Sequence, residues 1–260
     1  MKFKRVKSKI FHYDFLEKNH KAELTTQQIV GLIVLIVSFA IILILIFRLN
    51  LGETTNKEIC HNSVMLKAKS KNLAGELDCR TDYVCISGGG KCMGFNPTAT
   101  IEVDKDNKTQ IMKAIADEMS GCWWMFGEGK VDYGGTLDKY QQMLLWDDDY
   151  HCAICSMVKF SDDIKVEKIT YSEFYDYLLK TKKDKTQTYL TYLYDAPNID
   201  YVKAKITNTK LDVVKGEIST KDKYVIVTGM KLGYYINPYF VKSDEITNQT
   251  DCRVFDITSA

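Results

Sequence analysis

An uninterrupted run of apolar and uncharged residues extends from Ile29 to Phe47. As an α-helix with a rise of about 1.5 Å per residue, this run spans about 28 Å, close to the thickness of a bilayer's hydrocarbon core. Each Leu, Ile, Val or Phe favours insertion by a few tenths of a kcal/mol, and these contributions add along the run. The sequence therefore predicts one transmembrane helix over residues 29–48.

The charges on the two sides of this run are unequal. Residues 1–28 form a basic tail with seven basic and three acidic side chains, whereas a connector at 49–57 is neutral. Because cytoplasmic flanks carry the excess of Lys and Arg, we expect the tail in the cytoplasm and residues 58–260 outside the cell membrane, as one extracytoplasmic domain. Residues 49–260 hold 27 basic and 31 acidic side chains, and this balance argues against a nucleic-acid partner.

A cleaved secretory signal is the alternative interpretation of this N-terminus. The apolar region of such a signal is shorter, and a cleavage site with small residues follows it. Here Arg48-Leu49-Asn50-Leu51-Gly52 follows, without such a site. An uncleaved signal-anchor in the lipid bilayer is therefore the preferred interpretation.

All eight cysteines follow the apolar run. An even number confined to the outer side is typical of a disulfide framework in an oxidising compartment, although the sequence does not define the pairing. Two glycosylation sequons, at Asn107 and Asn248, lie on the same side and make the chain a candidate glycoprotein. The disulfide candidates are Cys60, Cys79, Cys85, Cys92, Cys122, Cys152, Cys155 and Cys252.

Cys152 and Cys155 form a C-x-x-C pair, which can be a thiol redox centre or half of a zinc site. Redox pairs usually begin a helix, whereas Ser156 to Phe160 have the composition of a strand. In a strand, positions i and i+3 lie about 10 Å apart on opposite faces. Disulfides need Cα atoms within about 7 Å. We therefore expect Cys152 and Cys155 to have different disulfide partners, with redox and zinc chemistry as the alternatives.

Helical and strand patterns are interspersed beyond the run, without a strict βαβ alternation, and this predicts an α+β domain braced by disulfides. Helices are expected over 57–70, from a cap at 106 or 107 to about 126, from a capping box at 170–173 to 181, and over 186–194. Strands are expected over 83–86, 100–103, 151–160, 202–206, 224–228, 234–241 and 254–257.

No arrangement of residues typical of an enzyme stands out. His61 and His151 are the two histidines after the run, both beside cysteines, and no G-x-S-x-G or H-E-x-x-H motif occurs. Asp147-Asp148-Asp149 could supply oxygen ligands to Ca²⁺, but a solvated acidic loop is the simpler interpretation. We therefore expect a protein without enzymatic activity, cofactor or metal.

Adjacent Trp123 and Trp124 are the candidates for contact with a partner. On a helix they point about 100° apart, so one helix face cannot bury both. We expect one of them in the core beside Cys122. The other is expected either packed under a loop or exposed as a contact site.

Two resemblances concern the N-terminus and the whole chain. Lys21-Ala-Glu-Leu-Thr-Thr-Gln-Gln28 and the apolar run resemble the start of archaeal type IV pilin-like proteins, which implies peptidase processing and assembly into a filament. These residues, together with Glu58-Ile-Cys-His-Asn-Ser63, Cys122-Trp-Trp-Met-Phe-Gly-Glu-Gly129 and His151-Cys-Ala-Ile-Cys155, are also similar to a group of archaeal single-pass membrane proteins. That resemblance implies topology and origin but no activity.

The sequence as a whole predicts a cell-surface protein whose anchored domain binds an envelope partner or assembles with its neighbours. An extracytoplasmic thiol oxidoreductase using Cys152 and Cys155 is one alternative. A pilin-like filament subunit is the other.

Overall fold

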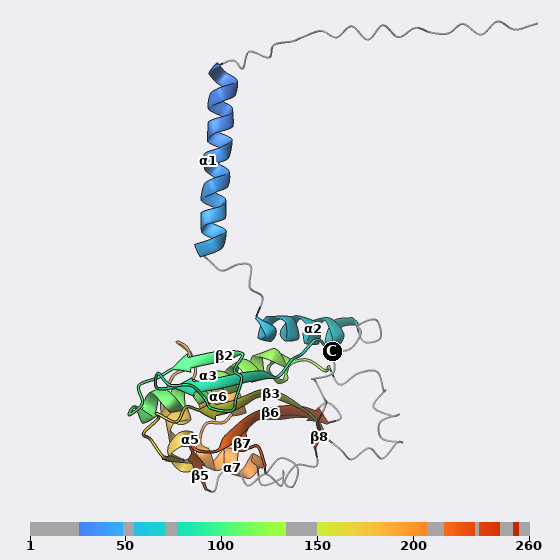
Figure 1. Cartoon of the computed structure of the whole chain (residues 1–260). Helices are drawn as coiled ribbons and strands as arrows, with labels where there is room; N and C mark the ends of the chain where they lie inside the picture. The colour runs from blue at the N-terminus through green and yellow to red at the C-terminus, as the bar shows by residue number, and fades with distance from the viewer. Residues whose placement is uncertain are drawn as a thin grey trace, which may run out of the picture. The chain divides into compact units, whose positions relative to one another are not determined.

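The computed structural model describes residues 26–48, 55–70, 77–133, 150–206, 216–231, 234–244 and 252–254. The chain divides into two units, Met1–Glu53 and Thr54–Ala260. The first unit contains the helix α1 (Thr26–Arg48), which covers the whole apolar run (Figure 1). The described side chains of α1, from Ile29 to Ile44, are all exposed.

Among the residues whose side chains are described, which in α1 are Ile29 to Ile44, no helix combines the length and hydropathy needed to cross a membrane.

The second unit is an α+β domain built on a mixed sheet. The order of its strands is β2-β1-β3-β6-β7, and β8 pairs with β3 beside this path. Neighbours are parallel in the pairs β1–β2, β1–β3 and β3–β8, and antiparallel in β3–β6 and β6–β7. The strands are β1 (Asp82–Ser87), β2 (Ala99–Glu102), β3 (Tyr150–Phe160), β6 (Lys223–Lys231), β7 (Tyr234–Lys242) and β8 (Cys252–Val254). A separate small sheet pairs β4 (Lys168–Thr170) with β5 (Glu217–Ser219).

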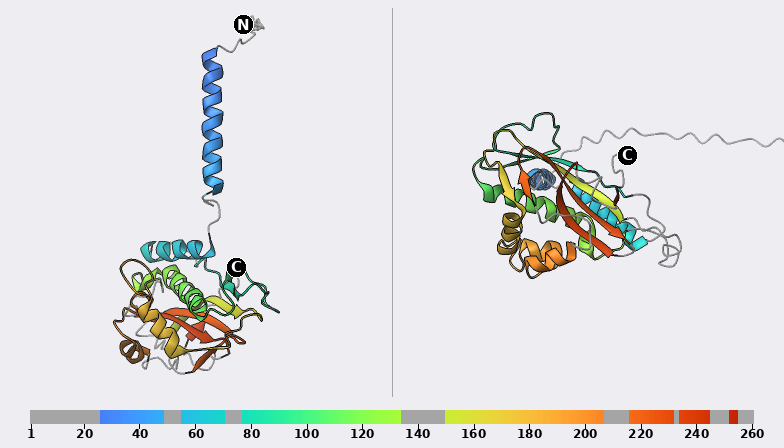
Figure 2. Two further views of the ribbon diagram at one scale, coloured as in Figure 1. Left: turned by 90° about the vertical axis from the view of Figure 1, so that its left-hand side faces the viewer. Right: turned by 90° about the horizontal axis from the view of Figure 1, so that it is seen from below.

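Helices gather on one side of the large sheet, as the two views of Figure 2 show. The central helix α3 contacts β3, β6 and β7, and it also contacts the helices α2, α5 and α6. These helices are α2 (Asn56–Ser70), α3 (Lys108–Met125), α5 (Tyr171–Lys180), α6 (Tyr189–Tyr194) and α7 (Ile199–Ile206). One short turn of 3-10 helix, η1 (Gly127–Gly129), follows α3.

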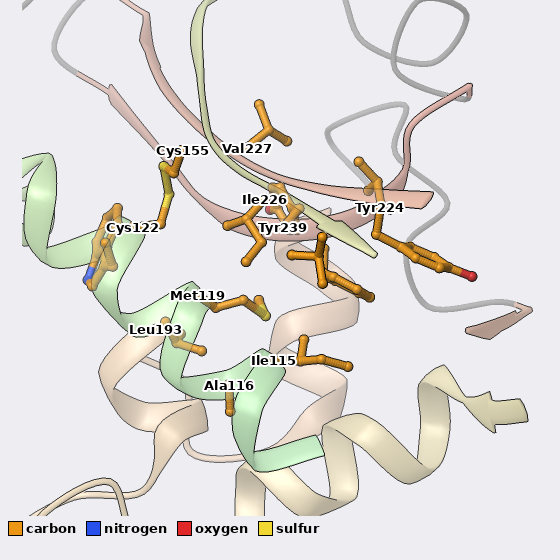
Figure 3. Close-up of a cluster of buried hydrophobic side chains, with 14 of the residues drawn as sticks. Ile115, Ala116, Met119, Cys122, Cys155, Leu193, Tyr224, Ile226, Val227 and Tyr239 are labelled. Carbon is orange, nitrogen blue, oxygen red and sulfur yellow. A yellow bond between two sulfur atoms is a disulfide. The ribbon is translucent and has the colours of Figure 1, made fainter. Parts of the chain in front are cut away.

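The core lies between α3 and the sheet. Ile115 and Met119 of α3 and Leu193 of α6 face Ile226 and Tyr239 of the sheet, and each is at most 3% exposed (Figure 3). Ile115 and Met119 lie one helical turn apart, which places both on the face that packs against the strands. The apolar spacing of the sequence therefore selects the buried face of α3.

A β-bulge in β3 directs two consecutive side chains toward α3. The pairing of β3 with β6 shifts between Ile154 and Ser156, which leaves Cys155 as the extra residue. Cys155 forms a disulfide with Cys122 of α3, and the Ser156 hydroxyl donates to Glu118 of the same helix. Without the bulge, adjacent strand residues would point to opposite faces.

Within the described part of the chain, β7 is an edge strand of the large sheet, and tyrosine hydroxyls occupy two of its backbone carbonyl groups. The Tyr171 hydroxyl donates to the Phe240 carbonyl at 3.1 Å, and the Tyr194 hydroxyl donates to the Pro238 carbonyl at 2.9 Å. Pro238 itself offers no N–H group, as is usual on an edge strand. This edge is therefore poorly suited to pairing with another chain.

Most predicted elements form, but one element type and one boundary were wrong. The predicted strand at 202–206 is part of helix α7, because Asn198 accepts a hydrogen bond from the Tyr201 N–H and starts a helix after Pro197. The predicted helix at 186–194 begins only at Tyr189, because the Asp184 carboxylate takes the N–H groups of residues 186 and 187. Of the strand predicted at 254–257, only Val254 lies in the described part of the chain, where it is the last residue of β8. Residues 255–257 lie outside the described ranges.

Candidate functional site

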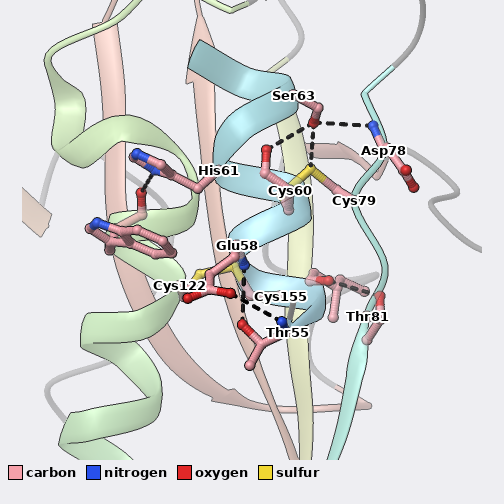
Figure 4. The surroundings of a disulfide bond; sticks show 12 residues. Thr55, Glu58, Cys60, His61, Ser63, Asp78, Cys79, Thr81, Cys122 and Cys155 are labelled. Carbon is pink, nitrogen blue, oxygen red and sulfur yellow. Dashed lines mark hydrogen bonds between the residues drawn. A yellow bond between two sulfur atoms is a disulfide. The ribbon is translucent and has the colours of Figure 1, made fainter. Parts of the chain in front are cut away.

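Disulfides cross-link the domain, and one of them ties the helix α3 to the strand β3. Cys60 of α2 bonds Cys79 (Figure 4), Cys85 bonds Cys92 around the loop after β1, and Cys122 bonds Cys155. Cys152 is also disulfide-bonded. Since Cys155 bonds Cys122, the two cysteines of the C-x-x-C motif do not bond each other, as the strand prediction requires. The side chain of Cys252 lies outside the described part.

The tryptophan pair separates as its helical spacing predicts. Trp123 is 8% exposed. Trp124 is half-buried and stacks on His61 of α2, with ring centroids 4.0 Å apart. The Nδ1 atom of His61 lies 2.7 Å from the Trp124 carbonyl oxygen. Because a carbonyl oxygen can only accept, the Nδ1–H group of His61 donates this hydrogen bond. Trp124 is thus packed by a helix, neither under a loop nor fully exposed as predicted.

Other candidate residues lie apart from this pair or outside the described ranges. Asn107 is the N-cap of α3, where its side-chain oxygen accepts a hydrogen bond from the Gln110 N–H. Asn248, Asp147-Asp148-Asp149 and the side chain of His151 lie outside the described part. Within the part that is described, no group of three or more His, Cys, Asp or Glu side chains could hold a metal ion.

A cleft of about 710 Å³ opens where α3 ends. Its walls come from three segments that are distant in sequence: the end of α3 with η1, the loop before α6 together with α6, and β7. Ligand sites in proteins commonly occupy about 300–1,000 Å³. The size and the convergence of three segments make this cleft the candidate functional site.

The chain enters the cleft through a left-handed turn. Gly127, Glu128 and Gly129 have φ values of +76°, +56° and +68°, and the Lys130 N–H closes the turn by donating to the Gly127 carbonyl at 2.9 Å. A Cβ atom on Gly127 would lie 2.2 Å from the side chain of Val131. At position 127, glycine avoids both the strain of a positive φ and the clash with Val131. Glu128 is not a glycine and still holds a left-handed conformation that L-residues disfavour. Such strain persists where the surrounding structure enforces it, and it is common at functional sites.

The Glu128 carboxylate is held inside the cleft by two donors. The Tyr192 hydroxyl donates to it at 2.7 Å, and the Lys130 ammonium group forms an ion pair with it. Burial raises the pKa of Glu128, but the hydrogen bonds from Lys130 and Tyr192 outweigh burial and leave its pKa below the ordinary value of 4.5. Burial and the neighbouring Glu128 carboxylate raise the pKa of the Tyr192 hydroxyl. Glu128 is therefore an anion and Tyr192 a neutral donor at neutral pH.

The loop before α6 brings two further charged side chains, Lys183 and Asp184, to the cleft. The Lys183 ammonium group lies 4.0 Å from the centre of the Tyr192 ring, a cation–π distance. The Asp184 carboxylate accepts hydrogen bonds from the Thr186 hydroxyl and from the backbone N–H groups of Thr186 and Gln187, and these bonds lower its pKa. These contacts fix the loop before α6.

No known protein family, curated protein or solved structure matches the chain. The cleft was not predicted from the sequence, apart from Trp123. Its one sequence signal is the pair of glycines at 127 and 129 directly after an apolar helix, which is a helix-end pattern. The wall residues of α6 and β7 carry no signal of their own, because only the fold brings them together.

Proposed function

We propose that this chain is a single-pass membrane protein whose disulfide-braced domain binds a partner outside the cell, without catalysis. The observation that supports it most is the exposed apolar surface of α1. In the second unit, by contrast, the apolar side chains form a buried core. All described side chains of α1 from Ile29 to Ile44 are exposed, although the whole run to Phe47 is apolar, apart from Ser38. Such a surface is costly in water and favourable in lipid.

The cysteines support an oxidising location for the second unit. Seven of them, in the part of the chain described with side chains, are in disulfides and none is free. Disulfides persist outside the cytoplasm and are rare within it. The cleft supplies the binding site of the proposal, because it combines fixed charges with aromatic walls.

Anchoring and orientation can be measured together in cells that produce the full chain. Intact cells are treated with a membrane-impermeant, lysine-reactive reagent, and labelled peptides are identified in the carbonate-washed membrane pellet. We expect label on domain lysines such as Lys130 and Lys182, and no label on the tail lysines at positions 2–21. Label on the tail alone would reverse the orientation, and a mature N-terminus near residues 19–22 would favour the pilin-like alternative.

A pair of arginines in α1 tests the anchor itself. Leu35 and Ile36 are 65% and 56% exposed, and their replacement by Arg places two charges near the middle of the run. Each central arginine costs about 2.5–3.5 kcal/mol on insertion, so the variant is expected to leave the membrane pellet. Leu66 and Met93, which are 61% and 66% exposed, give a matched double-arginine control in the domain. A Leu35/Ile36 variant that stays in the pellet like this control would contradict the anchor.

A further inference from the structure

We propose that the cleft beside Glu128 binds a neutral oligosaccharide. This inference names the ligand class of the binding function proposed above and rests on it. It depends on three features of the cleft: acidic and basic side chains that nearly balance, aromatic walls, and polar groups that can both donate and accept.

The near balance of charge argues for a ligand without a large net charge, because three acidic side chains (Glu128, Asp184 and Asp195) and two basic ones (Lys130 and Lys183) line the cleft. Glu128 is paired with Lys130 and with the Tyr192 hydroxyl, while Lys183 lies over the Tyr192 ring. Asp184 is engaged by the N–H groups of its own loop. A charged ligand would have to compete with these contacts for Glu128 or Asp184.

Aromatic rings supply the apolar part of the cleft. Tyr235 and Tyr192 are half-buried, and the nearly buried rings of Trp123 and Tyr239 also reach the cleft wall. A sugar ring has one face of C–H groups that packs against an aromatic ring, while its hydroxyls point sideways. Aromatic rings with a polar rim match that division between apolar and polar surface.

Neutral polar groups complete the match. Gln187 and Thr191 on one side and Asn237 on the other offer donors and acceptors to the cleft. The Asn237 Nδ2 atom donates to the Leu193 carbonyl at 2.6 Å, so the amide plane is fixed before any ligand arrives. Sugar hydroxyls donate and accept in turn. Fixed partners reduce the entropy lost on binding.

The test uses the purified full chain in lipid nanodiscs, which avoids detergents with sugar headgroups. The chain is applied to an array of immobilised glycans, and binding is repeated in solution by calorimetry with the free neutral saccharides that the array selects. Saturable binding to neutral saccharides supports the proposal. The proposal is overturned if the chain binds only sulfated or sialylated glycans, or if it binds nothing on the array. It is also overturned if calorimetry shows binding of the polyamine spermidine and not of neutral saccharides.

Variants at Tyr235 locate the binding. Tyr235→Ala removes an aromatic wall and is expected to weaken binding about tenfold, the usual scale for a contact that dominates a site. Tyr235→Phe keeps the ring and should bind like the wild type. Tyr83→Ala is the matched control, because Tyr83 is a half-buried strand tyrosine that packs on Phe95, away from the cleft. Equal affinity of Tyr235→Ala and wild type would overturn the assignment.

The two proposals fail separately. If the domain lysines are labelled but the chain binds no saccharide, the proposed ligand class is wrong and the anchored topology stands. A chain with its domain inside the cell overturns the topology, whatever the array shows.

Discussion

The Lys57 ammonium group of α2 lies 2.8 Å from each carboxylate oxygen of Glu118 of α3. Their side chains are only 23% and 10% exposed, and the Ser156 hydroxyl of β3 donates to the same carboxylate at 3.1 Å. One carboxylate thus joins two helices and the sheet, next to the Cys122–Cys155 disulfide. It fixes the position of α2, the first helix after the connector.

Replacing Glu118 with Gln should destabilise the domain by about 2 kcal/mol. Removing one partner of a buried ion pair costs about 3–5 kcal/mol, and the partial exposure of Lys57 reduces this cost. Chemical denaturation followed by circular dichroism measures the change. Lys180→Ala is the control, because its pair with Asp176 is solvent-exposed and should contribute about 0–1 kcal/mol. Equal effects of the two substitutions would show that the Lys57–Glu118 pair has no special weight.

Gly127→Ala should destabilise the domain by about 3 kcal/mol. A left-handed conformation costs an L-residue about 1–2 kcal/mol, and the clash of the new Cβ with Val131 adds a comparable amount. Gly94→Ala separates the two effects: Gly94 has φ +66°, but no atom lies within 4 Å of the place that an alanine methyl group would take, so only the backbone cost applies. Thermal unfolding of both variants gives the comparison. A Gly94 variant as unstable as the Gly127 variant would refute the steric part of this account.

Glu128 should stabilise the fold at neutral pH and lose this effect in acid. Its pKa in the folded domain lies below the ordinary 4.5, because the hydrogen bonds from Lys130 and Tyr192 outweigh burial. The stabilisation is therefore complete above about pH 4.5 and disappears as the pH falls through the lower folded value. Denaturation of wild type and Glu128→Gln at pH 7 and pH 3 should show a difference that shrinks in acid. The same difference at both pH values would exclude the ionised carboxylate as its cause.

Asn107→Ala should cost about 1 kcal/mol through loss of the α3 N-cap, with or without a glycan. Thr109→Ala is the informative control, because it removes the same sequon while leaving the Asn107 cap in place. Thr109 is exposed, so its own replacement should change the unfolding free energy little. If Thr109→Ala destabilises as much as Asn107→Ala in glycosylated protein, the glycan and not the cap is responsible.

Local signals in the sequence predicted most elements of the domain. The capping box at Thr170 and Glu173 starts α5, and Asn107 starts α3, because capping depends on a few adjacent residues. The strand 202–206 failed for a local reason as well. Tyr201 and Val202 favour strands, but Asn198 caps a helix whose Val202 is buried.

The cleft could not be predicted in the same way, because its residues meet only through the topology. Glu128 and Tyr192 are 64 positions apart in sequence and become partners at 2.7 Å after α3 and α6 pack together. The bulge at Cys155 is similar, since its extra residue is defined by pairing with β6 and not by its own sequence. Long-range pairing of this kind leaves no periodic pattern to read.

The most direct test of the account is non-reducing peptide mapping of the full chain from the membrane fraction of cells alkylated before lysis. The account predicts linked peptides for Cys60–Cys79, Cys85–Cys92 and Cys122–Cys155. Recovery of these links in membrane-bound protein would support a domain in an oxidising compartment. Alkylated, reduced cysteines, or a Cys152–Cys155 link, would contradict it.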